Sequence, residues 1–303
     1  MVSRSLLWLS DQERFRRFVV SSRLTRPVVD RFVAGDSVDD AIRAIRELNS
    51  AGIGGILDLL GEGVSRPEEV QAAADDYLLA IKRIEAEAVD TTVSVKPTQL
   101  GLAFDKGGCI DHLRRLAAEA AAIGSSIEID MEQSDHVVDT LDVYRVLQPD
   151  YPDLRVAMQA YLRRTPVDLE TMAALRPRVR LVKGAYAEPP ELAFSSRKEV
   201  DRQFSFLTTW LFERGCEPAI ASHDDALIEH ALRTAEVTGE GKRGFEIQML
   251  FGVRRDLQER LAQQGYRVKV YVPFGSAWYP YLMRRMAERP ANLRFFLRSV
   301  LGR

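Results

Sequence analysis

Eight short runs of apolar and β-branched residues recur along this chain, and each run ends on a side chain that can take part in chemistry. The eight terminal residues are Asp58, Lys96, Asp130, Gln159, Lys183, His223, Gln248 and Tyr271. Between most of the runs lies a stretch with the spacing of an amphipathic helix. Eight alternating strands and helices close into a TIM, or (β/α)8, barrel, whose active site lies at the carboxyl ends of its parallel strands. The sequence therefore predicts an α/β barrel in which these eight side chains point toward one pocket.

The predicted elements divide the chain into two parts. The strands are expected at Ile53–Asp58, Thr92–Lys96, Ile127–Asp130, Arg155–Gln159, Val179–Lys183, Ala219–His223, Phe245–Gln248 and Val268–Tyr271. Residues 1–50 contain no strand candidate and indicate helices, one of which begins near Ser37, where SVDD offers a serine N-cap with acidic residues in the first turn. Because 303 residues suit one barrel with a helical extension, we predict an N-terminal helical arm over residues 1–50. A catalytic barrel domain over residues 51–303 would include the C-terminal helices.

The composition argues against several kinds of protein. A net charge of −2 lacks the basic surplus of chains that bind nucleic acids, so no DNA or RNA partner is expected. The two cysteines form no CxxC pattern and the four histidines show no HxH or HExxH spacing, so we expect no disulfide framework and no metal site. No run of 18 uncharged apolar residues occurs, and the apolar run near the amino terminus is too short for a secretory signal. We therefore expect a cytoplasmic protein.

The segment after the last predicted strand carries two adjacent arginines near a tyrosine. Tyr281, Arg284, Arg285 and Glu288 fall at i, i+3, i+4 and i+7, which places them on one helical face. Just past a barrel mouth, such a face is suited to binding an anion. A solvated basic helix face is the alternative that the spacing alone leaves open.

The final residues indicate a second amphipathic helix. Its apolar face consists of Leu293, Phe296, Leu297, Val300 and Leu301. From Tyr279 onward the chain carries six arginines and one glutamate. A basic amphipathic helix can lie on an anionic membrane surface, so peripheral contact with the inner face of the cell membrane is a hypothesis. Packing against the protein's own barrel is the alternative.

Eight sequence pieces carry a resemblance to a known family. They are LDLLGE, SVKPTQLG, IEIDME, MQAYLRRT, RLVKGAYAE, ASHDD, FEIQMLFG and YVPFGSAWYPYLMRRMAE, in this order from about residue 55 to residue 292. Taken together, they resemble the proline dehydrogenase family, both its short single-function enzymes and the matching domain of the bifunctional proline utilisation A flavoenzymes. The set in its order is far more specific than any one piece.

The resemblance implies both a fold and an activity. The fold is a distorted TIM barrel with its last helix over the barrel mouth. The activity is the FAD-dependent oxidation of L-proline to Δ1-pyrroline-5-carboxylate, the first step of proline catabolism, with hydride transfer to flavin N5 and electrons passed to a membrane quinone. A chain of 303 residues has no room for the aldehyde dehydrogenase domain of the bifunctional proteins. A separate pyrroline-5-carboxylate dehydrogenase is therefore expected downstream.

The resemblance also implies roles for residues that would bind proline. The substrate carboxylate would be held by Lys96, Arg284 and Arg285, since guanidinium groups form bidentate hydrogen bonds with carboxylates. The apolar ring would be enclosed by Tyr271, Tyr281 and Leu250, which orient its reacting carbon toward the flavin. Asp130 would order the basic cluster and help to close the site.

A second set of residues is expected to contact the cofactor. By the same resemblance the FAD contacts are Gln159, Arg180, Val182, Lys183, Gly184, Ala185, Ser196, Lys198, His223 and Gln248. Arg180 would lie near flavin N5, where a cation stabilises the negative charge of the reduced ring. Gly184 would allow the backbone to approach the cofactor because it has no Cβ atom. His223 would contact the nucleotide half, and Gln159 and Gln248 would satisfy polar groups of the flavin and sugar.

Two other functions remain open from the residues alone. Lys96 and Lys183 both end predicted barrel strands, where a lysine can attack a carbonyl as in a Schiff-base lyase or aldolase. A non-enzymatic barrel that binds an amino acid or docks on a membrane is the second alternative. A yellow protein with bound flavin would distinguish the proposed oxidoreductase from the lyase, which would be colourless and trapped on its substrate by borohydride.

Glu62, in the loop after the first predicted strand, generates a direct test of the resemblance. The family residue at this position pairs with the first of the two arginines, here Arg284, and closes the site over bound proline. We therefore expect Glu62→Ala to raise the apparent Michaelis constant for proline in steady-state kinetics. An unchanged constant together with unchanged turnover would show that Glu62 is only an exposed loop acid.

Overall fold

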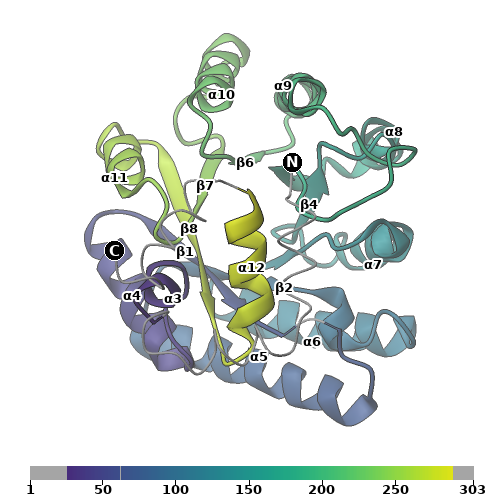
Figure 1. Ribbon diagram of the computed structural model, residues 1–303, viewed down its shortest axis with the longest axis vertical. Helices are drawn as coiled ribbons and strands as arrows, with labels where there is room; N and C mark the ends of the chain where they lie inside the picture. The colour runs from purple at the N-terminus through teal and green to yellow at the C-terminus, as the bar shows by residue number, and fades with distance from the viewer. Residues whose placement is uncertain (1–25, 62, 289–303) are drawn as a thin grey trace.

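The protein folds into a closed barrel of eight parallel strands. A computed structural model describes residues 26–61 and 63–288, and its ribbon is drawn in Figure 1. The strands are β1 Gly54–Leu59, β2 Thr91–Val95, β3 Ile127–Ile129, β4 Arg155–Gln159, β5 Arg178–Val182, β6 Ala219–Ala221, β7 Glu246–Leu250 and β8 Arg267–Phe274. Each strand pairs in parallel with the next, and β8 pairs with β1 to close the barrel. The predicted TIM-type fold is thereby confirmed.

Helices form a ring around the outside of the barrel (Figure 1). The ring consists of α4 Val38–Ser50, α5 Pro67–Glu87, α6 Lys106–Ala122, α7 Val137–Leu147, α8 Thr165–Met172, α9 Arg197–Glu213, α10 Asp225–Thr238 and α11 Arg255–Gln263. Two further helices, α3 Arg26–Phe32 and α12 Trp278–Glu288, lie at the carboxyl end of the barrel. Short 3-10 turns lie at Pro97–Leu100, Ser134–His136 and Ala173–Leu175. The predicted cap of α4 is confirmed, because Ser37 and Asp40 each bond the other's backbone N–H in a capping box.

The hydrophobic core lies between the strands and the helix ring. Successive residues of a strand point to opposite faces, so Leu57 on β1, Val93 and Val95 on β2 and Ile129 on β3 point outward. All four are fully buried in one apolar cluster with the inner faces of the helices. Full burial of such a side chain stabilises the fold by about 1.5–3 kcal/mol. The core therefore belongs to the outer layer, which leaves the inward positions available for polar residues.

The ends of several strands differ from the prediction. β6 stops at Ala221, because Asp224 caps α10 through the backbone N–H of Ala226 and the intervening residues form the connecting loop. β8 continues to Phe274, because its pairing with β1 extends that far. For β2, β3, β5 and β6, the residue predicted to end the strand lies just beyond the observed end of that strand.

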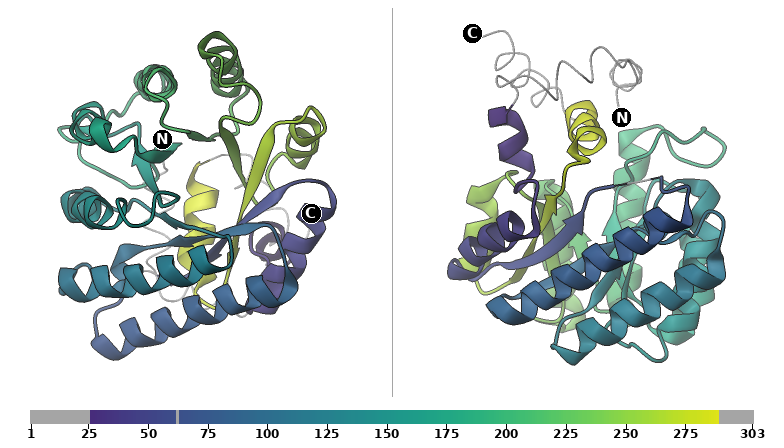
Figure 2. Two further views of the ribbon diagram at one scale, coloured as in Figure 1. Left: turned by 180° about the vertical axis from the view of Figure 1, so that it is seen from behind. Right: turned by 90° about the horizontal axis from the view of Figure 1, so that it is seen from below.

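The helix that follows β8 leaves the ring and crosses the carboxyl end of the barrel. Figure 1 shows α12 in front of the strands, and the right-hand view of Figure 2 shows α12 and α3 side by side at that end. α4, which precedes β1, packs instead against β1 and β8 and next to α5. It thus occupies the place in the ring that the helix after β8 would otherwise fill. The predicted position of the last helix over the mouth is confirmed.

Some predictions fall on parts of the chain that the structure does not describe. Glu62, the first 25 residues of the arm and the C-terminal segment 289–303 are outside the described residues, as is the side chain of Arg284. The division of the chain at residue 50 stays a prediction, although α4 on its N-terminal side is packed into the helix ring. Among the helices that are described, none combines the length and the apolar character that crossing a bilayer requires.

The loop after β7 approaches α3 so closely that only glycine fits. Gly252 has a φ of +72°, and a Cβ atom there would lie 1.7 Å from the carbonyl oxygen of Arg31. Gly124 has the same φ of +72° with nothing within 4 Å of the Cβ position, so it is a matched control. We expect Gly124→Ala to lower the free energy of unfolding by about 1–2 kcal/mol through backbone strain alone.

Gly252→Ala adds a steric clash to the same strain. It should lower the free energy of unfolding by a further 1–3 kcal/mol or so, because α3 has to shift. Urea unfolding of both variants, followed by circular dichroism, measures the difference. Equal losses would mean that α3 moves away at no energetic cost and is not firmly docked.

Candidate active site

A carboxylate at the carboxyl end of β3, only 13% exposed, is the centre of the candidate site. Asp130 accepts hydrogen bonds from Ser94 Oγ at 2.7 Å and from Tyr271 OH at 2.6 Å. Asp130 also accepts hydrogen bonds from two cations. Lys96 Nζ donates to Oδ2 at 3.1 Å, and the Arg180 guanidinium donates to Oδ1. These donors come from β2, β5 and β8 or the residue that follows them, so the closed barrel is what brings them together.

Lys96 joins this carboxylate to a second one. Its Nζ atom donates to Asp58 Oδ1 at 2.6 Å and lies 3.4 Å from Tyr271 OH. Lys96 is 5% exposed and Asp58 is 1% exposed, so this ion pair is well shielded from water. Removing one partner of such a buried pair typically costs about 3–5 kcal/mol, because the remaining charge is left uncompensated.

The two carboxylates have opposite pKa shifts. Burial raises the pKa of Asp130, but the Lys96 and Arg180 charges outweigh burial and hold its pKa at about 2. For Asp58, burial is stronger than the attraction of Lys96, and the nearby charge of Asp130 adds to it, so its pKa is raised. Burial, followed by the charges of Asp130 and Asp58, raises the pKa of Tyr271 well above its ordinary value. Tyr271 therefore stays protonated and remains a donor to Asp130.

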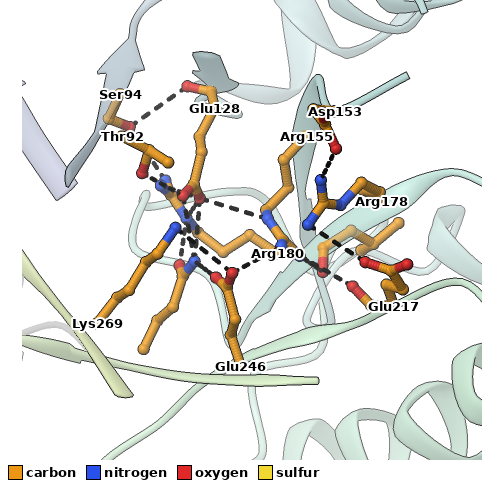
Figure 3. A network of polar contacts seen from close by, with 12 residues as sticks. Thr92, Ser94, Glu128, Asp153, Arg155, Arg178, Arg180, Glu217, Glu246 and Lys269 are labelled. Atoms are coloured by element: carbon orange, nitrogen blue, oxygen red, sulfur yellow. Dashed lines mark hydrogen bonds and ion pairs between the residues drawn. The ribbon is translucent and has the colours of Figure 1, made fainter. Parts of the chain in front are cut away.

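The interior of the barrel below this cluster is filled with charged side chains (Figure 3). Four acids and four bases point inward and are at most 15% exposed: Asp58, Glu128, Asp130, Glu246, Lys96, Arg155, Arg180 and Lys269. TIM barrels usually fill this space with branched apolar residues. Here each charge lies within 4 Å of an opposite charge, so the interior is an ion network with equal numbers of both signs.

α12 supplies the upper wall of the site. Tyr281 is 5% exposed and lies on α12, which crosses the mouth (Figure 1). The guanidinium carbon of Arg285 lies 5.2 Å from the centroid of the Tyr281 ring, a cation–π distance. The burial of Tyr281 does not fit a fully solvated helix face. The structure therefore places Tyr281 and Arg285 over the same end of the barrel as Asp130.

A polar cavity of about 620 Å³ lies at the opposite end of the barrel. It is lined by the first residues of six strands, Gly54, Thr91, Arg155, Arg178, Glu246 and Arg267. Chemistry in TIM barrels is carried out at the carboxyl ends of the strands, whereas the amino ends contribute to stability. We therefore assign the active site to the Asp130 end. The described part of the chain contains no cluster of His, Cys, Asp or Glu that could hold a metal ion.

Comparison with known proteins identifies the family of this barrel. The model of the proline dehydrogenase family matches residues 41–298. The chain belongs to the proline dehydrogenase family. It is 36% identical over 301 residues to proline dehydrogenase 1 of Bacillus subtilis subsp. natto, with 99% of both chains covered. It is also 38% identical over 279 residues to a proline dehydrogenase of Deinococcus radiodurans, with 90% of both covered.

Solved structures of proline dehydrogenase relatives share the fold. Proline utilization A from Bdellovibrio bacteriovorus, inactivated by N-propargylglycine, matches with a TM-score of 0.82 at 22% identity, over 93% of this chain and 37% of that one. A likeness at this identity shows the fold alone, and the chain spans a little over a third of the length of that protein. Family membership makes the protein an enzyme, an oxidoreductase of proline catabolism.

Gln159, which is predicted to contact the cofactor, has a buried hydrogen-bond acceptor that no described residue satisfies. Gln159 Nε2 donates to the carbonyl oxygens of Met131 and Glu132 at 3.0 and 2.8 Å. Its Oε1 atom is buried and has no hydrogen-bond partner among the described residues. A buried acceptor without a donor is costly. A ligand with an N–H group at the carboxyl end of β4 would satisfy it.

Lys183 and Gly184, which follow β5 and are predicted to contact the cofactor, make close contacts within the protein itself. Lys183 has the outward parity of its strand, and its ammonium pairs with Asp201 on α9 at 2.5 Å and with Asp224 at 3.3 Å. Its side chain is thus directed to the helix layer rather than to the common pocket. Gly184 has a φ of +117°, and a Cβ atom there would overlap the ring of Tyr161. Glycine is required at 184 by Tyr161, and contact with flavin stays a prediction.

The other predicted cofactor residues lie around the same end. Val182 is the last residue of β5, Ala185 lies in the loop that follows, Ser196 is the N-cap residue of α9, and Lys198 is exposed in its first turn. His223 Nε2 accepts the backbone N–H of Leu250 at 2.8 Å, which fixes the orientation of the predicted ring-wall residue. The side-chain amide of Gln248 is engaged inside the barrel, because its Oε1 atom accepts from Arg180 and its Nε2 atom donates to Glu246. The contacts of all these residues with FAD remain predictions.

Sequence reasoning missed three residues that organise the site. From the sequence, Asp58 is predicted only as the end of a strand, and no role in the site is assigned to Ser94 or Glu128. The detectable signal was alternation, since TVSVK, SIEID and FEIQ carry polar residues at every second position. Strands of a parallel barrel are usually continuous apolar runs. Polar residues with a period of two therefore indicated a charged barrel interior.

The depressed pKa of Asp130 generates a pH-dependent prediction. Asp130→Asn should lower the free energy of unfolding at pH 7 by about 3–5 kcal/mol, because Lys96 and Arg180 lose a counter-charge. The folded pKa is about 2 and the ordinary value is 3.8. The contribution of Asp130 is therefore complete above pH 4 and is lost as the pH falls through 2, so the gap between wild type and variant should shrink over that range.

Urea unfolding at pH 7, at pH 4 and at about pH 2.5 follows this gap from the region where the contribution is complete into the range where it is being lost. Asp111→Asn is the control, because Asp111 is 78% exposed and its one ion pair among the described residues is with Arg114, three residues away. It should change stability little at any pH. A gap for Asp130→Asn that stays constant with pH would show that its charge does not contribute to stability.

Proposed function

We propose that the protein is a FAD-dependent proline dehydrogenase that oxidises L-proline to Δ1-pyrroline-5-carboxylate, the first step of proline catabolism. The observation that supports this most is the position of the Lys96–Asp130–Tyr271 cluster at the barrel end that α12 crosses. It combines fixed cations with aromatic walls, as a cyclic amino acid requires. The relatives with the name proline dehydrogenase support the same activity.

The proposed substrate grip consists of three cations. Lys96, Arg284 and Arg285 would hold the carboxylate of proline, with the guanidinium groups forming charge-assisted hydrogen bonds. Lys96 already donates to two carboxylates and lies near Tyr271 OH. The contact with Tyr271, at 3.4 Å, is the longest of the three. A substrate oxygen would therefore exchange most readily with that contact and leave both ion pairs intact.

The proposed walls of the site orient the proline ring. Tyr271 and Tyr281 are held by the Asp130 hydrogen bond and by packing on α12, and Leu250 is held through its N–H by His223. A ring confined between fixed side chains reacts from one orientation, which lowers the entropic part of the barrier. Asp130 contributes by keeping Lys96 and Tyr271 in place.

The residues at the carboxyl end fit an FAD molecule. The chemistry that bound FAD supplies is acceptance of a hydride equivalent at N5 from the ring carbon next to the proline nitrogen. Gln159 Oε1 offers a buried acceptor for a flavin N–H group. Ser196 and Lys198 stand at the N-terminus of α9, where backbone N–H groups favour phosphate. Arg180 would provide positive charge near N5.

The proposal extends to partners that the barrel itself does not contain. Electrons would pass to a membrane quinone, and the basic C-terminal segment 289–303 would provide peripheral contact with the inner face of the cell membrane. A separate pyrroline-5-carboxylate dehydrogenase would consume the product. The protein would accordingly work in the cytoplasm or at the membrane surface.

The geometry is less favourable to a Schiff-base lyase. A lysine that attacks a carbonyl reacts as the neutral amine. Lys96 has two carboxylates within 3.1 Å of its Nζ atom, and Lys183 pairs with Asp201 and Asp224. Both ammonium groups are engaged in ion pairs with carboxylates, and attack on a carbonyl would have to break those pairs. Neither lysine is therefore poised as a nucleophile.

The test is an anaerobic titration of the purified protein with L-proline. We expect a yellow protein whose visible flavin absorbance is bleached stoichiometrically by L-proline and is unaffected by D-proline, because the cations fix the carboxylate and only one enantiomer then presents its hydrogen correctly. A folded protein that does not take up FAD would contradict the proposal. So would a yellow protein that binds L-proline without bleaching, which is the result expected of a non-enzymatic binding barrel.

A further inference from the structure

Glu128, a fully buried acid inside the barrel, has no place in the substrate or cofactor contacts proposed above. It lies on β3, two residues before Asp130 and one layer deeper in the barrel, and it is 1% exposed. Figure 3 shows its carboxylate in the middle of the ion network, between Arg180 and Arg155. An acid in this position has to be compensated by neighbouring donors, so its contacts reveal what it holds.

The Glu128 carboxylate binds one edge of the Arg180 guanidinium. Its Oε2 atom accepts from Arg180 Nε at 3.1 Å and from Nη2 at 2.6 Å. Its Oε1 atom accepts from Thr92 Oγ1 at 2.7 Å, and Gln248 Nε2 lies 3.1–3.3 Å from both oxygens. Besides its contacts with Arg180, the carboxylate is thus held by side chains from two other strands, β2 and β7.

The opposite edge of Arg180 meets the active-site carboxylate. Nη1 donates to Asp130 Oδ1 and to Ser94 Oγ, the latter at 3.1 Å. The guanidinium is planar and rigid, so binding at both edges fixes its position and its tilt. Glu128 holds it from below and Asp130 holds it from above. A shift of Glu128 would therefore be transmitted directly to Nη1.

The charge of Glu128 is maintained inside the barrel. Burial raises the pKa of Glu128, but the charges of Arg180 and Arg155 outweigh burial, and its pKa is lowered overall. Arg155 Nε lies 3.7 Å from Oε2 on the side away from Arg180's contact with Asp130. An ionised carboxylate forms the strong, short bonds to guanidinium that positioning requires.

We propose that Glu128 is a positioning residue for the reaction, which aligns the Arg180 guanidinium toward the cofactor. This inference rests on the proposed function, because it takes Arg180 to be the cation near the flavin. In this proposal Glu128 contacts neither proline nor flavin, and its effect on the reaction comes mainly through Arg180. Its loss should therefore slow the transfer of electrons from proline without weakening the binding of proline.

The flavin midpoint potential separates positioning from a simple charge effect. If Arg180 stayed in place, loss of the negative charge of Glu128 would leave the site more positive and would raise the potential, since positive charge stabilises the reduced flavin. If Arg180 is displaced, its own stabilisation is lost and the potential falls. The sign of the change therefore reports the position of Arg180.

The experiment compares Glu128→Gln with Glu246→Gln in the FAD-loaded enzyme. Glu246 is equally buried and belongs to the same network, but within the described part of the chain its polar contacts are with Arg155, Arg267, Lys269 and Gln248 and not with Arg180. For Glu128→Gln we expect a flavin reduction rate at saturating L-proline lower by about tenfold. Half-saturation should be unchanged and the midpoint potential lower. Glu246→Gln should keep the rate within about twofold, even where it lowers thermal stability as much.

Thr92→Val provides a second variant in case Glu128→Gln does not fold. It removes the hydroxyl that orients Glu128 and keeps every charge, so a smaller loss of rate and a smaller fall in potential are expected. A raised or unchanged potential together with an unchanged rate, in Glu128→Gln or in Thr92→Val, would overturn the positioning role. A wild-type enzyme that L-proline does not bleach would instead refute the proposed function itself.

Discussion

The barrel encloses charged side chains away from water, and the structure depends on each of these charges being neutralised by a neighbour. Transfer of a carboxylate or ammonium group into a protein interior costs roughly several kcal/mol for each ion, even after relaxation. Asp130 meets this cost by accepting from Lys96, Arg180, Tyr271 and Ser94 at once. The same bonds fix the side chains that would bind substrate, so stability and pre-organisation have one physical origin.

The layering of the barrel makes such an interior possible. The apolar core lies outside the strands, where residues such as Leu57, Val93 and Ile129 pack against the helix ring. Because that layer supplies the hydrophobic stabilisation, the inward positions can carry polar groups. The ion network then reaches from the cavity at the amino end, lined by Arg155 and Glu246, to the site under α12.

The sequence predicted the strands and their order well, because apolar runs and helical spacing are local signals. The N-cap at Ser37 and the barrel closure follow from such signals. Spacing alone did not predict α12 over the mouth, since solvated and packed basic faces have the same period, and the family resemblance was needed. Lys183 could not be oriented, because one residue of uncertainty in a strand end reverses its face. The pairing of Glu128 with Arg180 depends on contacts between β3 and β5, which no local pattern contains.

The exchange of places between α4 and α12 has a consequence for how the chain is made. α4 precedes every strand of the barrel in the chain, yet one of its two partner strands, β8, is the last of the eight. Its buried face, with Ile42 and Ile45, must wait for nearly the whole barrel to be synthesised. Contacts of such long sequence separation slow folding and leave apolar surface exposed to aggregation meanwhile. Until β8 has been synthesised, the face of α4 that packs against it lacks that partner strand.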